Sequence, residues 1–246
     1  MSPINADALS NVTLERMIAD LRASVDRDRR RNKIAGYFPD DGPLRRELYT
    51  KHLEFFRLGK VHMERAFMAA NRVGKTVVGA YEVTVHLTGE YPAWWDGRRF
   101  DRPTDWWAAS DTSETTRDIV QLALLGPPGD HGTGMIPHRH ILSVAPRRGV
   151  ADAVDLVRVK HVSGGISTLG FKAFEQGREK FQGTAKHGIW IDEECDESIY
   201  DECLVRLMTT NGLMLCTFTP LKGLSEIALR YLPHLAPAAE PEVEPW

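Results

Sequence analysis

The segment Arg65–Thr76 reads RAFMAANRVGKT, and it decides the fold. We expect Arg65–Met68 to form a short strand. The next eight residues, AANRVGKT at Ala69–Thr76, follow the phosphate-loop pattern G-x-x-x-x-G-K-[ST], with alanine where the first glycine is usual. In such a loop, backbone N–H groups face phosphate, Lys75 contacts the β- and γ-phosphates, and the Thr76 hydroxyl binds Mg²⁺. The alternative is a surface turn before a helix, because GKT alone also occurs by chance.

A second segment supports the first. Gly188–Glu194 reads GIWIDEE, which predicts an apolar strand that ends in acids. Asp192 at the strand end can hold the Mg²⁺ of a bound nucleotide, and Glu193 beside it can polarise an attacking water. The alternative is a strand that ends in a solvated acidic turn. The GKT loop upstream favours the metal-binding interpretation over this alternative.

A third segment, Leu213–Pro220, reads LMLCTFTP and predicts an apolar strand that finishes in two hydroxyls. Beside a γ-phosphate, the hydroxyls of Thr217 and Thr219 could sense whether that phosphate is present. The alternative is that they are merely β-branched residues at a strand end.

The whole chain alternates strand and helix patterns, which predicts an α/β fold with a mostly parallel central sheet flanked by helices. Together with the GKT loop and the strand-end acids, this pattern favours a P-loop NTPase core of the RecA/ASCE type. The turn Ser163–Gly165 predicts a hairpin, and therefore an antiparallel addition at the sheet edge. Strands are expected at Asp105–Ser110, Ile141–Val144, Val157–Val162, Ser167–Ala173, Gly188–Asp192 and Leu213–Phe218, and helices at Leu44–Leu58, Thr76–Leu87, Ser113–Leu125 and Glu197–Met208.

The two ends of the chain differ from the middle. Thr13–Arg31 has apolar residues at helical spacing and predicts a helix that runs into a basic stretch, either a solvated face or a contact for a phosphate backbone. The last residues, 233–246, are rich in proline, alanine and glutamate and predict a linker or a frayed end. We therefore divide the chain into a helical segment (1–34), a P-loop ATPase domain (35–232) and a tail (233–246).

Composition sets broad limits. The 246 residues carry a net charge of -3, so a DNA contact would have to be local or transient. Cys195, Cys203 and Cys216 contain no CxxC pair, which favours free thiols in a reducing cytoplasm over a disulfide framework or a zinc site. No apolar run is long enough to span a membrane, and the N-terminus lacks a signal-peptide pattern.

Taken together, the motifs resemble the large terminase subunit of tailed double-stranded DNA bacteriophages, over roughly residues 35 to 230. The arginine inside the loop and the Thr-Phe-Thr-Pro ending are specific when they occur together. The matching pieces are NRVGKT at 71–76, FQGT at 181–184, IWIDEE at 189–194 and TFTPLKG at 217–223, with YTKHLEFF at 49–56 similar to the segment that lies near adenine in that family.

The resemblance implies a role for each matching residue. Asp192 would be the Walker B acid, Glu193 the catalytic glutamate, and Thr217 and Thr219 the coupling motif that links hydrolysis to motion. Arg72 would sense or stabilise the γ-phosphate from within the loop. Mg²⁺ would be bound by Thr76 and Asp192, and ATP by Asn71, Arg72, Val73, Gly74, Lys75, Thr76, Tyr49 and His52.

The resemblance also implies an arginine supplied by a neighbouring subunit, which can raise the rate by about 10³–10⁵. In relatives it lies shortly before the Walker B strand, close to an Arg-Gly pair. Here the pair is Gln182-Gly183, a departure from the family pattern. Arg178 is the first candidate, with Arg117 and Arg158 behind it, and a surface salt bridge is the alternative for each.

The family's activity would be Mg²⁺-dependent hydrolysis of ATP that drives double-stranded DNA into a procapsid. The implied partners are DNA, the portal protein, the small terminase subunit and further copies of the chain in a ring, with no membrane. The implied place is the host bacterial cytoplasm and, transiently, the procapsid portal, but not the mature virion. We expect no nuclease activity, because residues 233–246 carry no cluster of metal-binding carboxylates.

Two other functions compete with this interpretation. A helicase-type translocase not involved in packaging commonly has two RecA-like lobes, whereas one set of motifs is present here. A nucleotide-binding regulator without turnover would have no need of Glu193.

Overall fold

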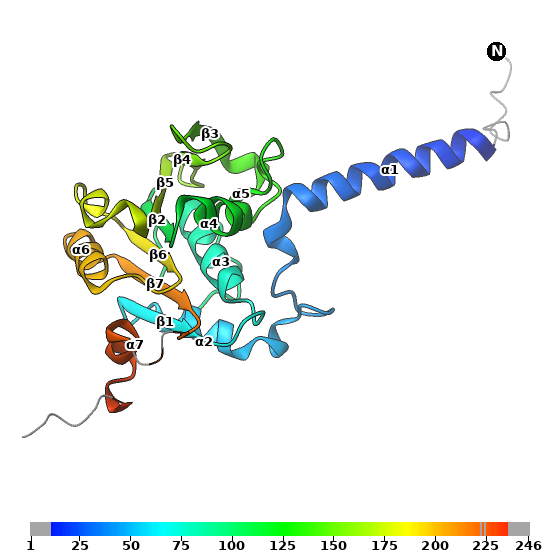
Figure 1. The fold of residues 1–246 in the computed structure, drawn as a ribbon. Helices are drawn as coiled ribbons and strands as arrows, with labels where there is room; N and C mark the ends of the chain where they lie inside the picture. The colour runs from blue at the N-terminus through cyan, green and yellow to red at the C-terminus, as the bar shows by residue number, and fades with distance from the viewer. Residues whose placement is uncertain (1–10, 222, 224, 236–246) are drawn as a thin grey trace, which may run out of the picture.

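The computed structural model describes residues 11–221, 223 and 225–235, and its centre is a seven-stranded sheet (Figure 1). The spatial order of the strands is β1-β7-β6-β2-β5-β4-β3. Their bounds are β1 Glu64–Met68, β2 Asp105–Ser110, β3 Ile141–Pro146, β4 Val154–Lys160, β5 Ile166–Ala173, β6 Gly188–Asp192 and β7 Leu213–Phe218.

Most of the sheet is parallel, and one edge of it is antiparallel. β1, β7, β6, β2 and β5 pair in parallel, whereas β4 runs antiparallel to β5 and β3 antiparallel to β4. The β4–β5 hairpin turns at Ser163–Gly165. The predicted α/β class, the parallel sheet and the antiparallel edge are all confirmed.

Burial explains why the central strands read as apolar runs. Every residue of β6 and β7 is buried, because helices cover both faces of the parallel part. β4 instead alternates: Val157 and Val159 are buried, while Leu156, Arg158 and Lys160 face solvent. The antiparallel edge therefore has one covered and one open face.

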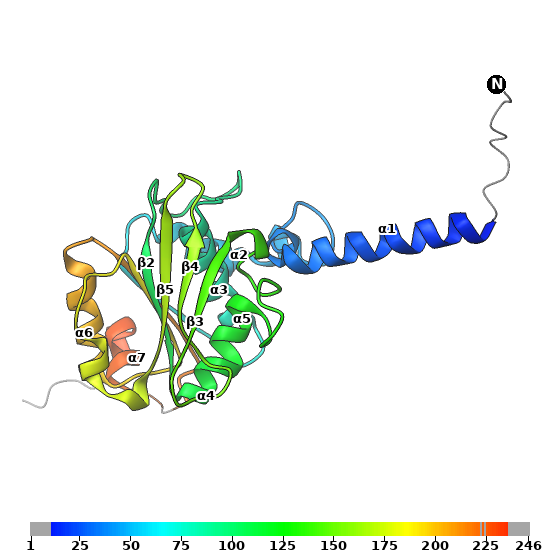
Figure 2. The same ribbon diagram turned by 90° about the horizontal axis from the view of Figure 1, so that it is seen from above.

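The helices form a layer on each side of the sheet (Figure 2). α3 (Lys75–Thr88) packs on one face, with α4 (Ser113–Thr115) and α5 (Leu122–Leu125) beside it, and α6 (Glu197–Met208) and α7 (Glu226–Tyr231) lie on the other. The close approach of α3 to β6 requires a glycine, because a Cβ at Gly79 would overlap the indole of Trp190.

Several elements differ from their predicted form. The expected helix Leu44–Leu58 is a 3₁₀ turn at Arg46–Leu48 followed by α2 (Thr50–Leu58). The expected helix Ser113–Leu125 has a π-helical stretch at Thr116–Gln121 between α4 and α5. α7 was not expected. Of the predicted tail, Pro233–Leu235 forms a 3₁₀ turn, and residues 236–246 lie outside the described part of the chain.

The predicted N-terminal helix exists as α1 (Asn11–Arg31), which projects from the body as a single rod (Figure 1). Residues Lys33–Gly36 form a 3₁₀ turn that joins it to the domain. Across the described residues, neither α1 nor any other helix combines the length and apolar character needed to cross a bilayer.

Candidate nucleotide-binding site

The loop between β1 and α3 has the backbone that a phosphate cradle needs. Gly74 immediately precedes α3 with φ of 86°, a left-handed conformation that glycine adopts freely. Arg72 also has a positive φ, 67°, which is uncommon for a residue with a side chain. Asn71, Arg72 and Val73 are exposed, so the loop presents its backbone to solvent ahead of the α3 N-terminus.

Lys75 lies inside the curve of this loop. Its Nζ donates hydrogen bonds to the carbonyl oxygens of Ala69 (3.0 Å) and Ala70 (2.9 Å), and to Thr219 Oγ1 (2.7 Å). The Thr219 hydroxyl also lies 3.0 Å from Asn71 Oδ1. The ammonium group of Lys75 thus connects the loop to the residue that follows β7 by one position, Thr219.

Thr76 and Asp192 face one another at the start of α3 and the end of β6. Thr76 Oγ1 lies 3.3 Å from Asp192 Oδ2. Both are hard oxygen ligands, and Mg²⁺ commonly takes one or two protein oxygens and completes its shell with water and phosphate. The pair therefore fits a nucleotide-bound Mg²⁺, although the described residues contain no group of three or more His, Cys, Asp or Glu that could hold a metal unaided.

Asp192 is held by a buried chain of hydrogen bonds. Trp190 Nε1 donates to Thr217 Oγ1 (2.7 Å), whose hydroxyl donates to Asp192 Oδ1 (2.6 Å). Burial raises the pKa of Asp192 to about 7, against the hydrogen bond from Thr217, which lowers it. The sequence pointed to Thr217 but not to Trp190, since an indole inside an apolar strand carries no mark of a polar role.

Glu193 follows Asp192 and turns away from the strand. Its φ is 94°, and its N–H donates to the Thr217 carbonyl oxygen at 3.0 Å. Burial raises the pKa of the half-buried Glu193 side chain, Lys75 lowers it, and Asp111 is among the neighbouring acids that raise it. Asp111 was missed, although it directly follows the predicted strand Asp105–Ser110 and so lies at the same sheet edge.

Strand order brings these groups together. β7 lies between β1, which leads into the loop, and β6, which ends at Asp192. Parallel strands present their carboxyl ends at one edge, so Thr217 reaches Asp192 on one side while Thr219 reaches Lys75 on the other. The pattern of the sequence predicted both hydroxyls at a strand end, but not which strands would be their neighbours.

A small cavity opens beside the loop. Its volume is about 320 Å³, and it is lined by Tyr37, Phe38, Leu44, Tyr49, His52, Arg72, Val73, Gly74 and Val77. The rings of Tyr49 and His52 meet edge to face with centroids 5.2 Å apart. Burial lowers the pKa of His52, which favours its neutral form. The predicted pair Tyr49 and His52 thus lies in an aromatic pocket, to which the turn before α2 adds residues that the sequence did not single out.

The three candidate arginines lie apart from this site. Arg178 forms an ion pair with Glu202 of α6, with Nε 3.0 Å from Oε2. Arg117 pairs with its neighbour Asp118, and Arg158 projects from the open face of β4. None of them joins the groups around Lys75 and Asp192, so any role in hydrolysis would have to be played toward another copy of the chain.

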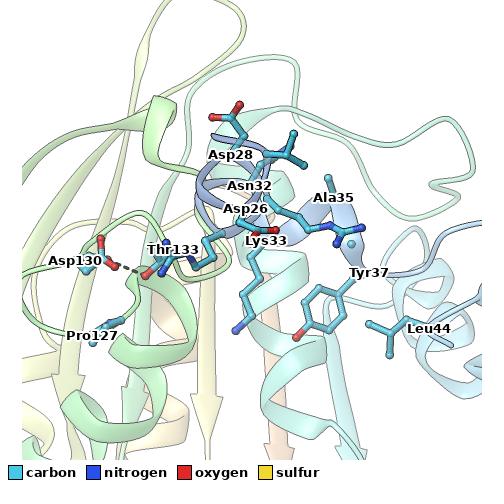
Figure 3. A pocket seen from close by; sticks show the side chains of 14 residues that line it. Asp26, Asp28, Asn32, Lys33, Ala35, Tyr37, Leu44, Pro127, Asp130 and Thr133 are labelled. Atoms are coloured by element: carbon cyan, nitrogen blue, oxygen red, sulfur yellow. Dashed lines mark hydrogen bonds between the residues drawn. The ribbon is translucent and has the colours of Figure 1, made fainter. Parts of the chain in front are cut away.

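A larger cavity lies elsewhere. It is an open groove of about 1470 Å³ between the last turns of α1 and the segment that follows α5 (Figure 3). Its charged lining includes Asp26, Asp28, Lys33 and Asp130, of both signs. No residue of the loop at Ala69–Thr76 lines it, so its size does not mark the nucleotide site.

The fold and the site define a P-loop NTPase in which one strand lies between the loop strand and the strand that bears the acid. The family model for the large terminase subunit, T4likevirus-type, N-terminal region, matches residues 66–241. The chain belongs to this large terminase subunit family.

Two individual proteins illustrate the relationship. The large terminase subunit of Salmonella phage P22 is 38% identical over 204 residues, which cover 75% of this chain and 41% of the phage P22 protein. A large terminase of a thermophilic bacteriophage, solved in complex with ADP, has a similar fold, with a TM-score of 0.52 at 16% identity, covering 76% of this chain and 42% of that one. The chain thus spans about two fifths of the length of either relative.

Proposed function

We propose that this chain is the ATPase region of a large terminase and hydrolyses ATP to drive double-stranded DNA into a procapsid. The observation that carries the proposal is the end of β7, where Thr219 contacts Lys75 and Thr217 contacts Asp192. Binding or release of the γ-phosphate would alter both contacts, and both are made by residues at the end of β7. We assign Thr217 and Thr219 to the coupling of hydrolysis to movement.

In the proposed reaction, water attacks the γ-phosphate in line with the leaving oxygen. Glu193 orients the water, while Lys75 and Arg72 stabilise the charge of the phosphates together with the backbone from Asn71 to Thr76. Mg²⁺, held by Thr76 and Asp192, would neutralise phosphate charge. The strained backbone of Glu193 supports its assignment, because such strain gathers at functional sites, and Lys75 of the loop lies close enough to lower the pKa of the Glu193 carboxyl.

Adenine would occupy the aromatic cavity beside the loop. Tyr49 and His52 supply ring faces and edges, and a neutral His52 can act as hydrogen-bond donor or acceptor. The ADP bound to the terminase of the thermophilic bacteriophage supports a nucleotide as the ligand of this fold.

Membership of the terminase family favours packaging over the helicase-type alternative. The proposed partners are DNA, the portal protein, the small terminase subunit and further copies of the chain in a ring. The proposed location is the host cytoplasm and the procapsid portal. Within the chain, we propose that residues 35–232 form the ATPase unit and residues 1–34 a separate helical segment.

Two substitutions test the chemistry. Glu193→Gln should bind a fluorescent ATP analogue normally and lose about 10²–10⁴ of the hydrolysis rate, because it removes the group that orients the water. Lys75→Ala should weaken binding itself.

Glu194→Gln is the matched control, since it makes the same chemical change one residue further on, in a side chain that accepts a hydrogen bond from Ser225. It should keep its activity. Wild-type hydrolysis by Glu193→Gln would show that another group orients the water.

A further inference from the structure

α1 carries an apolar stripe that no described part of the chain covers. Every side chain from Leu14 to Arg31 is exposed except that of Ser24, which is half-buried. Five of these side chains are large and apolar, and they are between 42% and 64% exposed: Leu14, Met17, Ile18, Leu21 and Val25.

Such a helix is unusual on physical grounds. Most helices in proteins owe their stability to the packing of an amphipathic face, and contiguous exposed apolar patches mark interaction sites. α1 is 21 residues long and joins the body only through its C-terminal end (Figure 1). Its stripe is therefore available to a partner along most of its length.

The spacing of the stripe matches a two-stranded seam. Leu14, Ile18, Leu21 and Val25 are separated by steps of four, three and four residues, which is the alternation of d and a positions in a heptad repeat, with leucine at d and β-branched residues at a. A helix of the same kind would fill this seam with knobs-into-holes packing. We propose that α1 pairs with α1 of a second copy of this chain, in antiparallel orientation.

Charge complementarity selects the antiparallel arrangement. When Ile18 lies opposite Leu21 of the second copy, Leu14 lies opposite Val25 of that copy. The flanking residue Glu15 then faces Arg22 of the second copy, and the twofold symmetry repeats this pair. Two complementary ion pairs thus border the apolar seam.

A parallel pair would have no such contacts. It would place Met17 opposite Arg22, and it would bring Arg29, Arg30 and Arg31 of both copies side by side. The antiparallel pair keeps these arginine clusters at opposite ends. It also keeps the two bodies apart, because a helix of 21 residues is about 32 Å long.

The first test is the association state of the whole chain. Sedimentation velocity over a wide range of protein concentration should show a monomer–dimer equilibrium. Leu21→Gln should raise the dissociation constant more than about tenfold, because each dimer loses two buried leucines. A chain that stays monomeric at every concentration, or a Leu21→Gln variant that associates like the wild type, would overturn the proposal.

The second test is a charge exchange. Glu15→Arg or Arg22→Glu alone should weaken the dimer, and the double variant should restore it. Arg16→Glu is the matched control: Arg16 and Arg22 each have an aspartate four residues further on, so both substitutions perturb the helix alike, but residue 16 lies away from the seam.

Failure of the double variant to restore association would overturn the antiparallel pairing. None of these residues lies in the nucleotide site, so every variant should bind ATP as the wild type does. Normal ATP binding also serves as the control that each variant is folded. The outcome is independent of the proposed ATPase function.

Discussion

Two residues of the nucleotide site have backbone conformations that their side chains disfavour. Arg72 and Glu193 have φ values of 67° and 94°. Such conformations cost of order 1–3 kcal/mol each and persist only where the surroundings enforce them. Here the surroundings are the tight loop before α3 and the hydrogen bond from the Glu193 N–H to Thr217. Neither conformation could be predicted from the sequence, because a glycine would ordinarily mark such positions.

The site could be predicted in part, for a definable reason. The loop pattern identifies Lys75 and Thr76, and the ends of apolar strands identify Asp192, Thr217 and Thr219. Both patterns are local features of the sequence. The hydrogen bonds of these residues to one another follow once the strands are parallel. Trp190 and the residues of the aromatic cavity depend on contacts between distant segments, and no local pattern encodes them.

Thr217 offers a prediction about stability. Thr217→Val keeps the shape but removes the hydroxyl that accepts from Trp190 and donates to Asp192. A buried indole N–H would lose its acceptor, so the free energy of unfolding should fall by about 1–3 kcal/mol, measured by urea denaturation. Thr184→Val, at an exposed position, makes the same change and should stay within about 0.5 kcal/mol of the wild type. Equal effects at the two positions would contradict the structural role of the hydroxyl.

The raised pKa of Asp192 predicts a pH dependence. An unfolded aspartate has a pKa of about 3.9, whereas the folded value is about 7. Between these values the folded protein holds a proton that the unfolded chain has released, so this group lowers the unfolding free energy as pH rises, by at most about 1.4 kcal/mol per unit. In EDTA without nucleotide, the stability of Asp192→Asn relative to wild type should therefore increase from about pH 4 to about pH 7 and then level off. A difference that does not change with pH would show that Asp192 titrates normally.

At the level of elements, the contact between α3 and β6 fixes the position of the loop relative to Asp192. Gly79→Ala should destabilise the protein although alanine favours helix by about 1 kcal/mol, because its Cβ would overlap Trp190 and overpacking costs about 1–3 kcal/mol. Chemical denaturation measures the difference. Gly36→Ala, where a Cβ meets nothing within 4 Å, is the control and should be near neutral. A stabilised Gly79→Ala would mean that α3 can shift away from the sheet at little cost.

The strands could be predicted from the sequence more closely than the helices. β2, β6 and β7 begin and end at the predicted residues, because buried parallel strands read as short apolar runs with clear ends. α7 was missed, since its six residues are too few to give a helical period. The order of the strands could not be predicted at all, because it depends on long-range pairing rather than on any local pattern.

For the whole molecule, the arginine in trans that the family resemblance implies, with Arg178 as first candidate, can be tested by complementation. A Glu193→Gln subunit keeps Arg178 but lacks the group that orients the water. An Arg178→Ala subunit keeps Glu193 but lacks the arginine. Each alone should be nearly inactive under assembly conditions, with Arg178→Ala losing about 10³–10⁵ of the rate. Mixed assemblies should regain ATPase activity, because some sites combine an intact glutamate with an intact arginine.

The ion pair between Arg178 and Glu202 gives this test its control. If Arg178 acts only through that ion pair, Glu202→Gln, which also weakens the pair between Glu202 and Arg206, should lower the rate at least as much as Arg178→Ala. Two results together would contradict the role of Arg178 in trans: a mixture no more active than the sum of its components, and a Glu202→Gln variant that loses as much ATPase activity as Arg178→Ala. Arg117 and Arg158 would then be the remaining candidates.

The three cysteines have a practical consequence. Cys195, Cys203 and Cys216 are free and buried, and burial raises the pKa of each thiol, that of Cys216 to about 12. Protonated, enclosed thiols react slowly with maleimides. A single cysteine introduced at an exposed position such as Arg16 could therefore be labelled selectively in the folded chain, without removing the native ones. A fluorophore placed there would let the motion of the projecting helix be followed one molecule at a time.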